Sequence, residues 1–406
     1  MYFKPDSTRL RIVSPSGAVP EASGNPGVLS KEGGLFASLT GEMTISRRYL
    51  IITLLLFAFT CINLIQPWRS ILVVQDPPNH HPPCAQAIGQ NAQSSSFEQS
   101  IPPQPNREEE KDDYKIDPSL AVTSPRYKKR VYDIITRAFP YDRNRAIPNI
   151  VWRSWKSKEL NGERTKWAKT WEENAKNWNL TMLDDKDMED WMQKRVKHIP
   201  CVMEAWELMP QIILRSDFFR YLILFVEGDT DTSLVVEPEK WVPAEFGSWR
   251  DQAGLVANEQ DQPSGEMWAR RRFQIVQYCM MFKKGHPALA NVITSVIIET
   301  MKRKAEGKLQ QLGNIDILEW TGPALFTDDL FNYWNRRGPG GLSINLPEDE
   351  EWNAGYQGEF SGSSLSGFTD TQKVGDLILL HRSRFWFRPS NDSFIVHHCS
   401  GSWKGW

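Results

Sequence analysis

The distribution of large apolar residues determines where this chain can build a folded core. All of its 17 tryptophans except Trp68 lie after residue 145. Residues 75–113 are rich in proline, glutamine and serine and contain few large apolar side chains. Such a segment cannot bury enough apolar surface to offset the entropy of ordering it. We therefore predict one folded domain over residues 146–406, preceded by a low-complexity stem over residues 67–145.

An uncharged apolar run lies before the stem, at residues 49–66. A membrane-spanning helix needs about 17–25 mainly apolar residues, so this run is at the short end of that range. The tail over residues 1–48 has more basic than acidic residues, which favours a cytoplasmic N-terminus. We predict a single-pass, type II signal anchor with the folded domain in the lumen. Two other interpretations stay open: a signal peptide that starts at Met43, and a buried helix of a soluble domain.

Apolar periodicity alternates between strand-like and helix-like segments over residues 146–406. Helical periodicity with a break near Pro210 spans residues 201–228, and an amphipathic helix is expected near the end of the stem, at residues 125–139. Such alternation is typical of an α/β domain whose strands are largely parallel. The expected strands lie in residues 147–155, 180–185, 232–236, 254–259 and 375–380, and other helices in residues 166–178, 287–308 and 324–335.

Charge and cysteine content exclude some classes of protein. Lys and Arg number 48 against 50 Asp and Glu, a net charge of −2, so we expect no nucleic-acid partner bound through a broad basic surface. The sequence has no Walker A loop, no G-x-G-x-x-G and no G-x-S-x-G elbow, which are the motifs of nucleotide, dinucleotide and hydrolase sites. Pairing among Cys201, Cys279 and Cys399 is permitted in the lumen but is not determined by their spacing.

A cluster of polar residues lies within the longest helical segment, in the sequence R-S-D-F-F-R-Y. Asp217, Arg220 and Tyr221 are three and four positions apart, so they share one face of a helix. Burying a carboxylate beside a guanidinium is unfavourable unless both find further partners. The hydroxyl groups of a sugar would supply such partners.

Two aspartates follow this helix closely. Asp229 and Asp231 flank Thr230, and in an extended segment alternate side chains point the same way. A pair of carboxylates suits a hard divalent cation that phosphate groups also bind. A lone D-x-D is weak evidence by itself, and the preceding helix makes it considerably stronger.

Taken in order, these motifs resemble those of the fungal initiation-specific α-1,6-mannosyltransferase family, a group of D-x-D glycosyltransferases. The resemblance extends over most of residues 146–406. The family implies a GT-A fold, which is a Rossmann-like nucleotide-sugar-binding domain, in a type II protein of the Golgi membrane. The matching segments are residues 147–156, 215–221, 229–231, 285–287, 321–328, 374–376 and 397–404.

The resemblance also implies roles for individual residues. The donor would be GDP-mannose, the cofactor Mn²⁺ or a similar cation, and the acceptor a glycan, with α-1,6 linkage and retained anomeric configuration. A complex with other Golgi mannosyltransferases is a further implied partner. The resemblance implies that Asp229 and Asp231 are the catalytic and metal-binding residues, with His397 or His398 completing the metal shell. For the substrate, it implies that Trp155 binds the base and that Asp217, Arg220 and Tyr221 bind the sugar. Ser402 and Trp403 would bind the diphosphate.

The sequence departs from the family just before the D-x-D motif. Glu227 and Gly228 run directly into Asp229, where the family has about four more residues, including a second glycine and a tyrosine. The loss shortens an extended segment by more than about 10 Å, so either the helix unwinds or the aspartates are misplaced. The short connection keeps open the alternative of an inactive pseudoenzyme or subunit. A sphingolipid or other nucleotide-sugar transferase of the same superfamily is a separate alternative, because donor choice depends on side chains that the sequence does not resolve. Glu259 and Asp261 are candidates to face the acceptor, with a solvated loop as the alternative.

Overall fold

The structure is a computed structural model. It describes residues 114–227, 229–230, 233–261, 269–344, 358–386 and 389–398, with backbone only at 229, 230 and 233. Within these residues no helix is long and apolar enough to span a bilayer. The apolar run predicted to be the signal anchor, residues 49–66, lies outside the described residues, so the structure does not bear on it.

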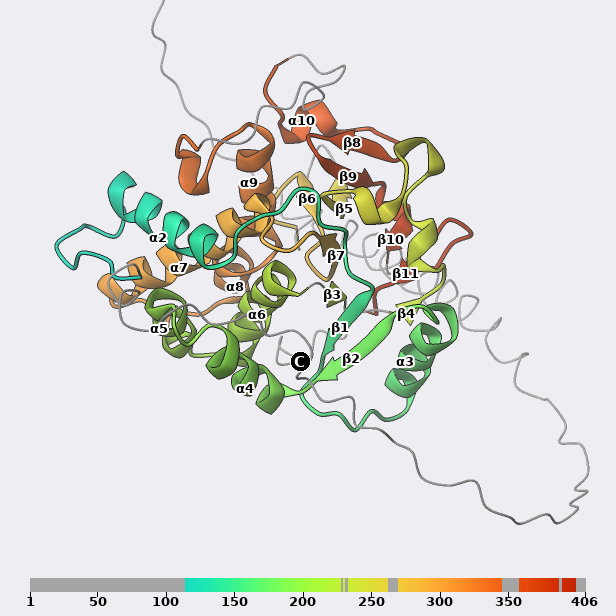
Figure 1. Cartoon of the computed structure of the whole chain (residues 1–406), viewed down its shortest axis with the longest axis horizontal. Coiled ribbons are helices and arrows are strands. Elements are labelled where there is room, and N and C mark those ends of the chain that lie inside the picture. Colours follow the sequence, from blue (N-terminus) through green and yellow to red (C-terminus); the bar gives the residue numbers. More distant parts are fainter. Residues whose placement is uncertain are drawn as a thin grey trace, which may run out of the picture. The chain divides into compact units, whose positions relative to one another are not determined.

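Along the described chain, helices and strands alternate at first and then follow one another in blocks of one kind (Figure 1). The α-helices are α2 (Pro125–Ala138), α3 (Glu163–Asn174), α4 (Asp185–Arg195), α5 (Pro200–Leu208), α6 (Ile212–Val226), α7 (Pro287–Ala305), α8 (Asn314–Trp320), α9 (Pro323–Trp334) and α10 (Gly362–Leu365). The strands are β1 (Ile150–Ser154), β2 (Asn179–Leu183), β3 (Asp229–Thr230), β4 (Ser233–Leu234), β5 (Gly254–Asp261), β6 (Phe273–Ile275), β7 (Cys279–Phe282), β8 (Gln372–Val374), β9 (Leu377–Leu380), β10 (Phe385–Trp386) and β11 (Ile395–Val396).

The main sheet is mixed rather than mostly parallel. Its strand order is β3-β7-β5-β9-β8, with β6 also paired to β5. Only β5 and β9 run parallel in it, and the other pairs are antiparallel. The α/β class is confirmed, but the expectation of largely parallel strands is wrong. The reason is local: β6 and β7 follow each other without a crossover helix and pair with opposite ends of β5, and parallel neighbours need such a crossover.

Both faces of the main sheet are covered. In β5, Val256 lies in the larger hydrophobic cluster, whereas Leu255 and Ala257 lie in the smaller one. Alternate residues of a strand point to opposite faces, so the two clusters lie on the two sides of the sheet. The larger cluster contains α6, α7 and α9, and α7 contacts α2, α5, α6, α8 and α9.

The helix that the sequence places near the end of the stem is part of this core. α2 buries Tyr127, Val131, Ile134 and Ile135, and it packs against α7. Ser124 caps its first turn by accepting a hydrogen bond from the backbone N–H of Tyr127, which is a common helix start. The hydrophobic core therefore includes residues before 146, where the sequence predicted the domain to begin.

The junction between β7 and α7 needs its glycine. Gly285 has φ +73°, and a Cβ there would lie 2.7 Å from the carbonyl oxygen of Phe139. His286 caps α7 by accepting a hydrogen bond from the N–H of Ala288, and Pro287 occupies the first turn. Gly285 thus lets the chain after α2 pass directly against this turn, which fixes α2 and α7 relative to each other.

Candidate active site

The D-x-D segment begins at the edge of the main sheet. Asp229 pairs with Met280, and Thr230 pairs with Cys279, in an antiparallel ladder between β3 and β7. α6 stays helical to Val226, so it does not unwind to compensate for the short connection. The side chain of Asp229 and the whole of Asp231 lie outside the described residues. Their role in holding a metal therefore stays a prediction.

Asp217 is the centre of a buried polar cluster on α6. It is 3% exposed. Arg220 Nη1 and Gln277 Nε2 donate to its Oδ1 at 3.3 and 3.2 Å, and Thr321 Oγ1 donates to its Oδ2 at 3.2 Å. Burial raises the pKa of Asp217 to about 6, although Arg220, Gln277 and Thr321 act in the opposite direction. The carboxyl is therefore held in a fixed orientation by donors from α6, from the β6–β7 segment and from the α8–α9 turn.

The structure corrects the substrate-binding role predicted for Tyr221. Its side chain is fully buried and stacks on Phe326. Its hydroxyl lies 2.8 Å from Gln277 Oε1 and 2.9 Å from the carbonyl oxygen of Thr321. The motif spacing placed Tyr221 correctly beside Asp217, but the tyrosine supports the partners of Asp217 from within the core.

Trp155 lies just beyond the end of β1, as the first-strand position requires. Its backbone N–H donates to the carbonyl oxygen of Leu183 at 2.9 Å. The guanidinium of Arg164, at the start of α3, lies 4.3 Å from the centre of the Trp155 ring. This distance is typical of a cation–π contact. Sequence reasoning did not find Arg164, because nothing in the local pattern brings α3 back over the end of β1.

His397 and His398 do not act as a pair. The ring of His397 stacks on Tyr278 and the ring of His398 stacks on Trp167, each with centroids 3.8 Å apart. The two imidazoles therefore have separate ring partners, one in the segment before β7 and one on α3. Burial lowers the pKa of His398, so its ring is neutral at physiological pH. No cluster of three or more His, Cys, Asp or Glu side chains that could hold a metal occurs in the described part of the chain.

The residues proposed to face the acceptor have partners within the protein. Asp261 accepts hydrogen bonds from Ser366 Oγ and from the backbone N–H of Gly367. Glu259 accepts from Gln274 Nε2 at 2.8 Å. Asp261 therefore anchors the segment before β8, and the solvated-loop alternative does not hold for these two side chains.

The other predicted groups are distributed as follows. Ser402 and Trp403 lie outside the described residues, as does Cys399. Cys201 and Cys279 are buried and do not form a disulfide with each other. Gln277 and Thr321, which bind Asp217, were not predicted as site residues: Thr321 belongs to a recognised T-G-P motif, whereas Gln277 had no distinguishing signal.

Known proteins resemble this chain over the region that contains the site. Residues 162–246 match the family described as "Glycosyltransferase sugar-binding region containing DXD motif", a span that includes both the Asp217 helix and β3. The chain thus carries a glycosyltransferase domain of the DXD type, and it is a transferase.

Several similar proteins are mannosyltransferases by name. The chain is 29% identical over 292 residues to the initiation-specific α-1,6-mannosyltransferase of Candida albicans, covering 66% of this chain and 74% of that protein. It is 26% identical over 275 residues to the protein of the same name from Schizosaccharomyces pombe, covering 64% of each. The resemblance inferred from the motifs is confirmed. A solved structure, PaToxG glycosyltransferase, aligns with a TM-score of 0.33 and 14% identity over 52% of this chain and 78% of that one, which adds nothing to the assignment.

Proposed function

We propose that this protein is a mannosyltransferase that moves mannose from GDP-mannose to a glycan acceptor, with α-1,6 linkage and retention of configuration. The observation that carries the proposal is the buried Asp217 cluster on α6. This helix ends at Val226, and the strand with the D-x-D motif begins three residues later, at Asp229. A carboxylate and a guanidinium held together in a fixed geometry suit the hydroxyl groups of a donor sugar.

Each element of the site has a distinct task in this proposal. Asp217 and Arg220 bind and orient the donor sugar, and Trp155 stacks on the nucleotide base. Asp229 and Asp231 would hold Mn²⁺, since their hard carboxylate oxygens suit that ion. When bound, the metal neutralises the negative charge that develops on the leaving diphosphate. One imidazole, from His397 or His398, together with Ser402 and Trp403, would complete the site from the C-terminal segment.

The proposed cellular setting follows from the N-terminal sequence. We place the protein in the Golgi membrane as a single-pass type II protein with its catalytic domain in the lumen, where it meets other mannosyltransferases of the same pathway. Support comes from the uncharged run at residues 49–66 and the excess of basic residues before it. Detection of epitope tags at each end in selectively permeabilised cells tests the topology, and exposure of a C-terminal tag to the cytoplasm would contradict it.

The experiment that tests the activity is hydrolysis of GDP-mannose by the purified full-length chain with Mn²⁺. Release of GDP that disappears on chelation, and in the Asp229→Asn variant, supports the proposal. Hydrolysis of other nucleotide sugars at equal or higher rates would favour the alternative donor.

An inactive subunit is the second candidate, favoured by one observation: α6 ends at Val226 and β3 begins at Asp229. A variant with four residues, including Gly-x-Tyr, inserted between Gly228 and Asp229 separates the possibilities. If the wild-type chain binds GDP without hydrolysing the donor and the insertion restores turnover, the short connection is the defect. If the wild-type chain already turns over, the subunit interpretation is wrong.

A further inference from the structure

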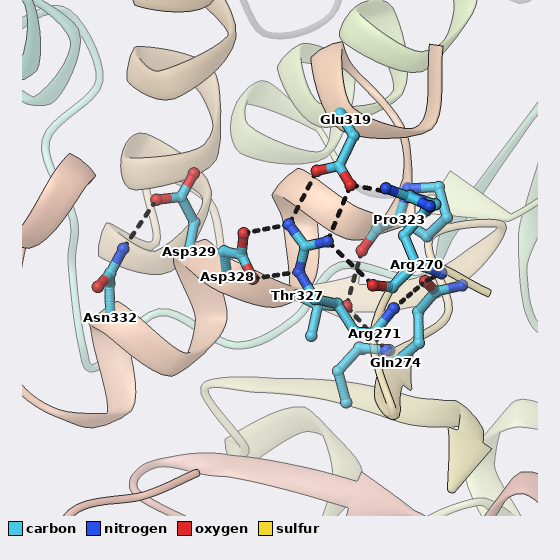
Figure 2. A network of polar contacts seen from close by, with 10 residues as sticks. Arg270, Arg271, Gln274, Glu319, Pro323, Thr327, Asp328, Asp329 and Asn332 are labelled. Carbon is cyan, nitrogen blue, oxygen red and sulfur yellow. Dashed lines mark hydrogen bonds and ion pairs between the residues drawn. The ribbon is translucent and has the colours of Figure 1, made fainter. Parts of the chain in front are cut away.

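An arginine outside the site joins two helices through four hydrogen bonds (Figure 2). Arg271 Nε and Nη2 donate to the two carboxylate oxygens of Asp328 at 2.7 and 2.6 Å. Its Nη1 and Nη2 donate to the carboxylate oxygens of Glu319 at 2.9 and 2.8 Å. Arg270 Nε also donates to Glu319 at 3.0 Å. Paired arginine–carboxylate contacts of this kind fix geometry as well as adding stability.

The two carboxylates lie on either side of the α8–α9 turn. Glu319 is in the last turn of α8, and Asp328 is in the second turn of α9. Between them, Gly322 passes so close to α8 that a Cβ there would lie 2.7 Å from Leu318 Cα. Arg271 therefore bridges the helices across a tight turn and sets the angle between them.

This turn carries one of the hydrogen-bond donors to Asp217. Thr321 is fully buried, and its Oγ1 donates to Asp217 Oδ2 at 3.2 Å. The same network also reaches β6: the backbone N–H of Ile275 donates to Thr327 Oγ1 at 2.9 Å. A shift of α8 against α9 would thus move Thr321 away from Asp217 while leaving the other donors, Arg220 and Gln277, in place.

We propose that Arg271 is a positioning residue for the sugar-binding carboxyl of Asp217, acting through Glu319, Asp328 and the Thr321 turn. The inference rests on the proposed function only in assigning the sugar to Asp217; the mechanical link is independent of that assignment. Without Arg271, the two carboxylates lose the guanidinium that they share, and among the described residues Arg270 still donates to Glu319. The two helices then lose the link that fixes the angle between them, and screened repulsion between the two partly exposed carboxylates adds to the effect.

The first test does not depend on catalysis. The thermal midpoint of the full-length chain is measured from pH 4 to 8 with and without Asp217→Asn, and the difference between the two reports the titration of Asp217. The only charged side chain that bonds Asp217 in the described residues is Arg220, with uncharged Gln277, Thr321 and Tyr221 around it. In the Arg271→Gln background this titration is expected to move to higher pH, because the carboxylate has lost its Thr321 donor.

A double-mutant cycle identifies the route. Thr321→Val is expected to produce the same shift, and Arg271→Gln combined with Thr321→Val is expected to shift the titration no further. Arg271→Lys, which keeps the charge but not the paired geometry, is expected to give an intermediate shift. The matched control is Lys304→Gln, which removes a 2.7 Å ion pair between Lys304 of α7 and Glu204 of α5 and involves no residue of α8 or α9.

Activity is the second measurement. If GDP-mannose is hydrolysed, Arg271→Gln is expected to raise KM for the donor at least fivefold at neutral pH and to move the acid limb of the rate profile in step with the titration. Equal shifts for Lys304→Gln and Arg271→Gln, or full additivity with Thr321→Val, would overturn the proposal. Absence of hydrolysis by the wild-type chain would count against the proposed function alone, because the titration still decides the role of Arg271.

Discussion

Replacing Asp217 by asparagine is expected to stabilise the protein at neutral pH while removing its capacity to bind the donor sugar. Burial raises the pKa of Asp217 from 3.8 to about 6, so the folded protein holds a proton there that the unfolded chain has lost. The associated stability is complete below pH 3.8 and is lost as pH rises through about 6. Above that pH, the charged carboxylate destabilises the fold relative to a neutral group.

The size of the effect follows from the shift. A pKa that rises by about two corresponds to about 3 kcal/mol at pH 7.5. This figure already includes the attraction of Arg220, which lowers the pKa of Asp217. Asparagine has the shape of the protonated acid and can keep hydrogen bonds to Gln277 and Thr321. For a domain of this size, about 3 kcal/mol corresponds to a rise of about 6–12 °C in the thermal midpoint.

The assay is differential scanning fluorimetry of the full-length chain and its Asp217→Asn variant from pH 4 to 8, alongside binding of GDP-mannose. We expect nearly equal midpoints near pH 4, an advantage of the variant that grows between about pH 4 and 6 and levels off above, and loss of donor binding. Asp217→Ala is the control, since it also removes the charge but leaves Thr321 and Gln277 without their partner. A variant that is less stable than wild type at pH 7.5, with no pH dependence, would refute the reasoning about this buried carboxyl.

Other predictions concern the framework of the site. In urea titrations, Gly285→Ala is expected to destabilise the fold by several kcal/mol more than Gly307→Ala. Both glycines have positive φ, but of the two only Gly285 has backbone atoms within 3 Å of a new Cβ. Trp171→Ala is expected to lower the free energy of unfolding by about 3–5 kcal/mol, since the side chain is fully buried; a loss below about 1 kcal/mol would contradict its place in the core. Tyr333→Phe removes a hydroxyl that donates to Asp376 at 3.0 Å and is expected to raise the pKa of that carboxyl. Burial acts to raise the pKa of Asp376, but His286 and Tyr333 outweigh it, and the net pKa is lowered. The carboxylate therefore stabilises the fold above about pH 4, and this contribution is lost as the pH falls further. Acid unfolding of Tyr333→Phe should begin at a higher pH than that of the wild-type chain.

Sequence patterns were sufficient where the deciding interactions are local. The break near Pro210 separates α5 from α6 as expected, and helical spacing placed Asp217 and Arg220 on one face. The spacing of Trp167, Trp171 and Trp178 predicts one helix that packs them into the core. Trp171 and Trp178 are buried, but Trp178 lies beyond the end of α3, and Trp167 is only partly buried.

Prediction failed where the deciding contacts join distant segments. Tyr221 has its partners in Gln277 and Thr321, which are 56 and 100 positions away, so its burial cannot be read from its own helix. The rings of His397 and His398 stack on Tyr278 and Trp167, which are also distant in the sequence, so these contacts cannot be read from the His-His pair alone. The mixed sheet depends on how β6 and β7 share β5, which no periodicity encodes.

The measurement that tests the central proposal most directly is transfer of mannose to a glycan. The purified full-length chain is incubated with GDP-mannose, Mn²⁺ and a high-mannose glycan, and the product is analysed by mass spectrometry and by digestion with a linkage-specific mannosidase. We predict a product heavier by one mannose, sensitive to α-1,6 cleavage, and absent in the Asp217→Asn and Asp229→Asn variants. Equal product formation by those variants, or transfer from another nucleotide sugar but not from GDP-mannose, would contradict the account.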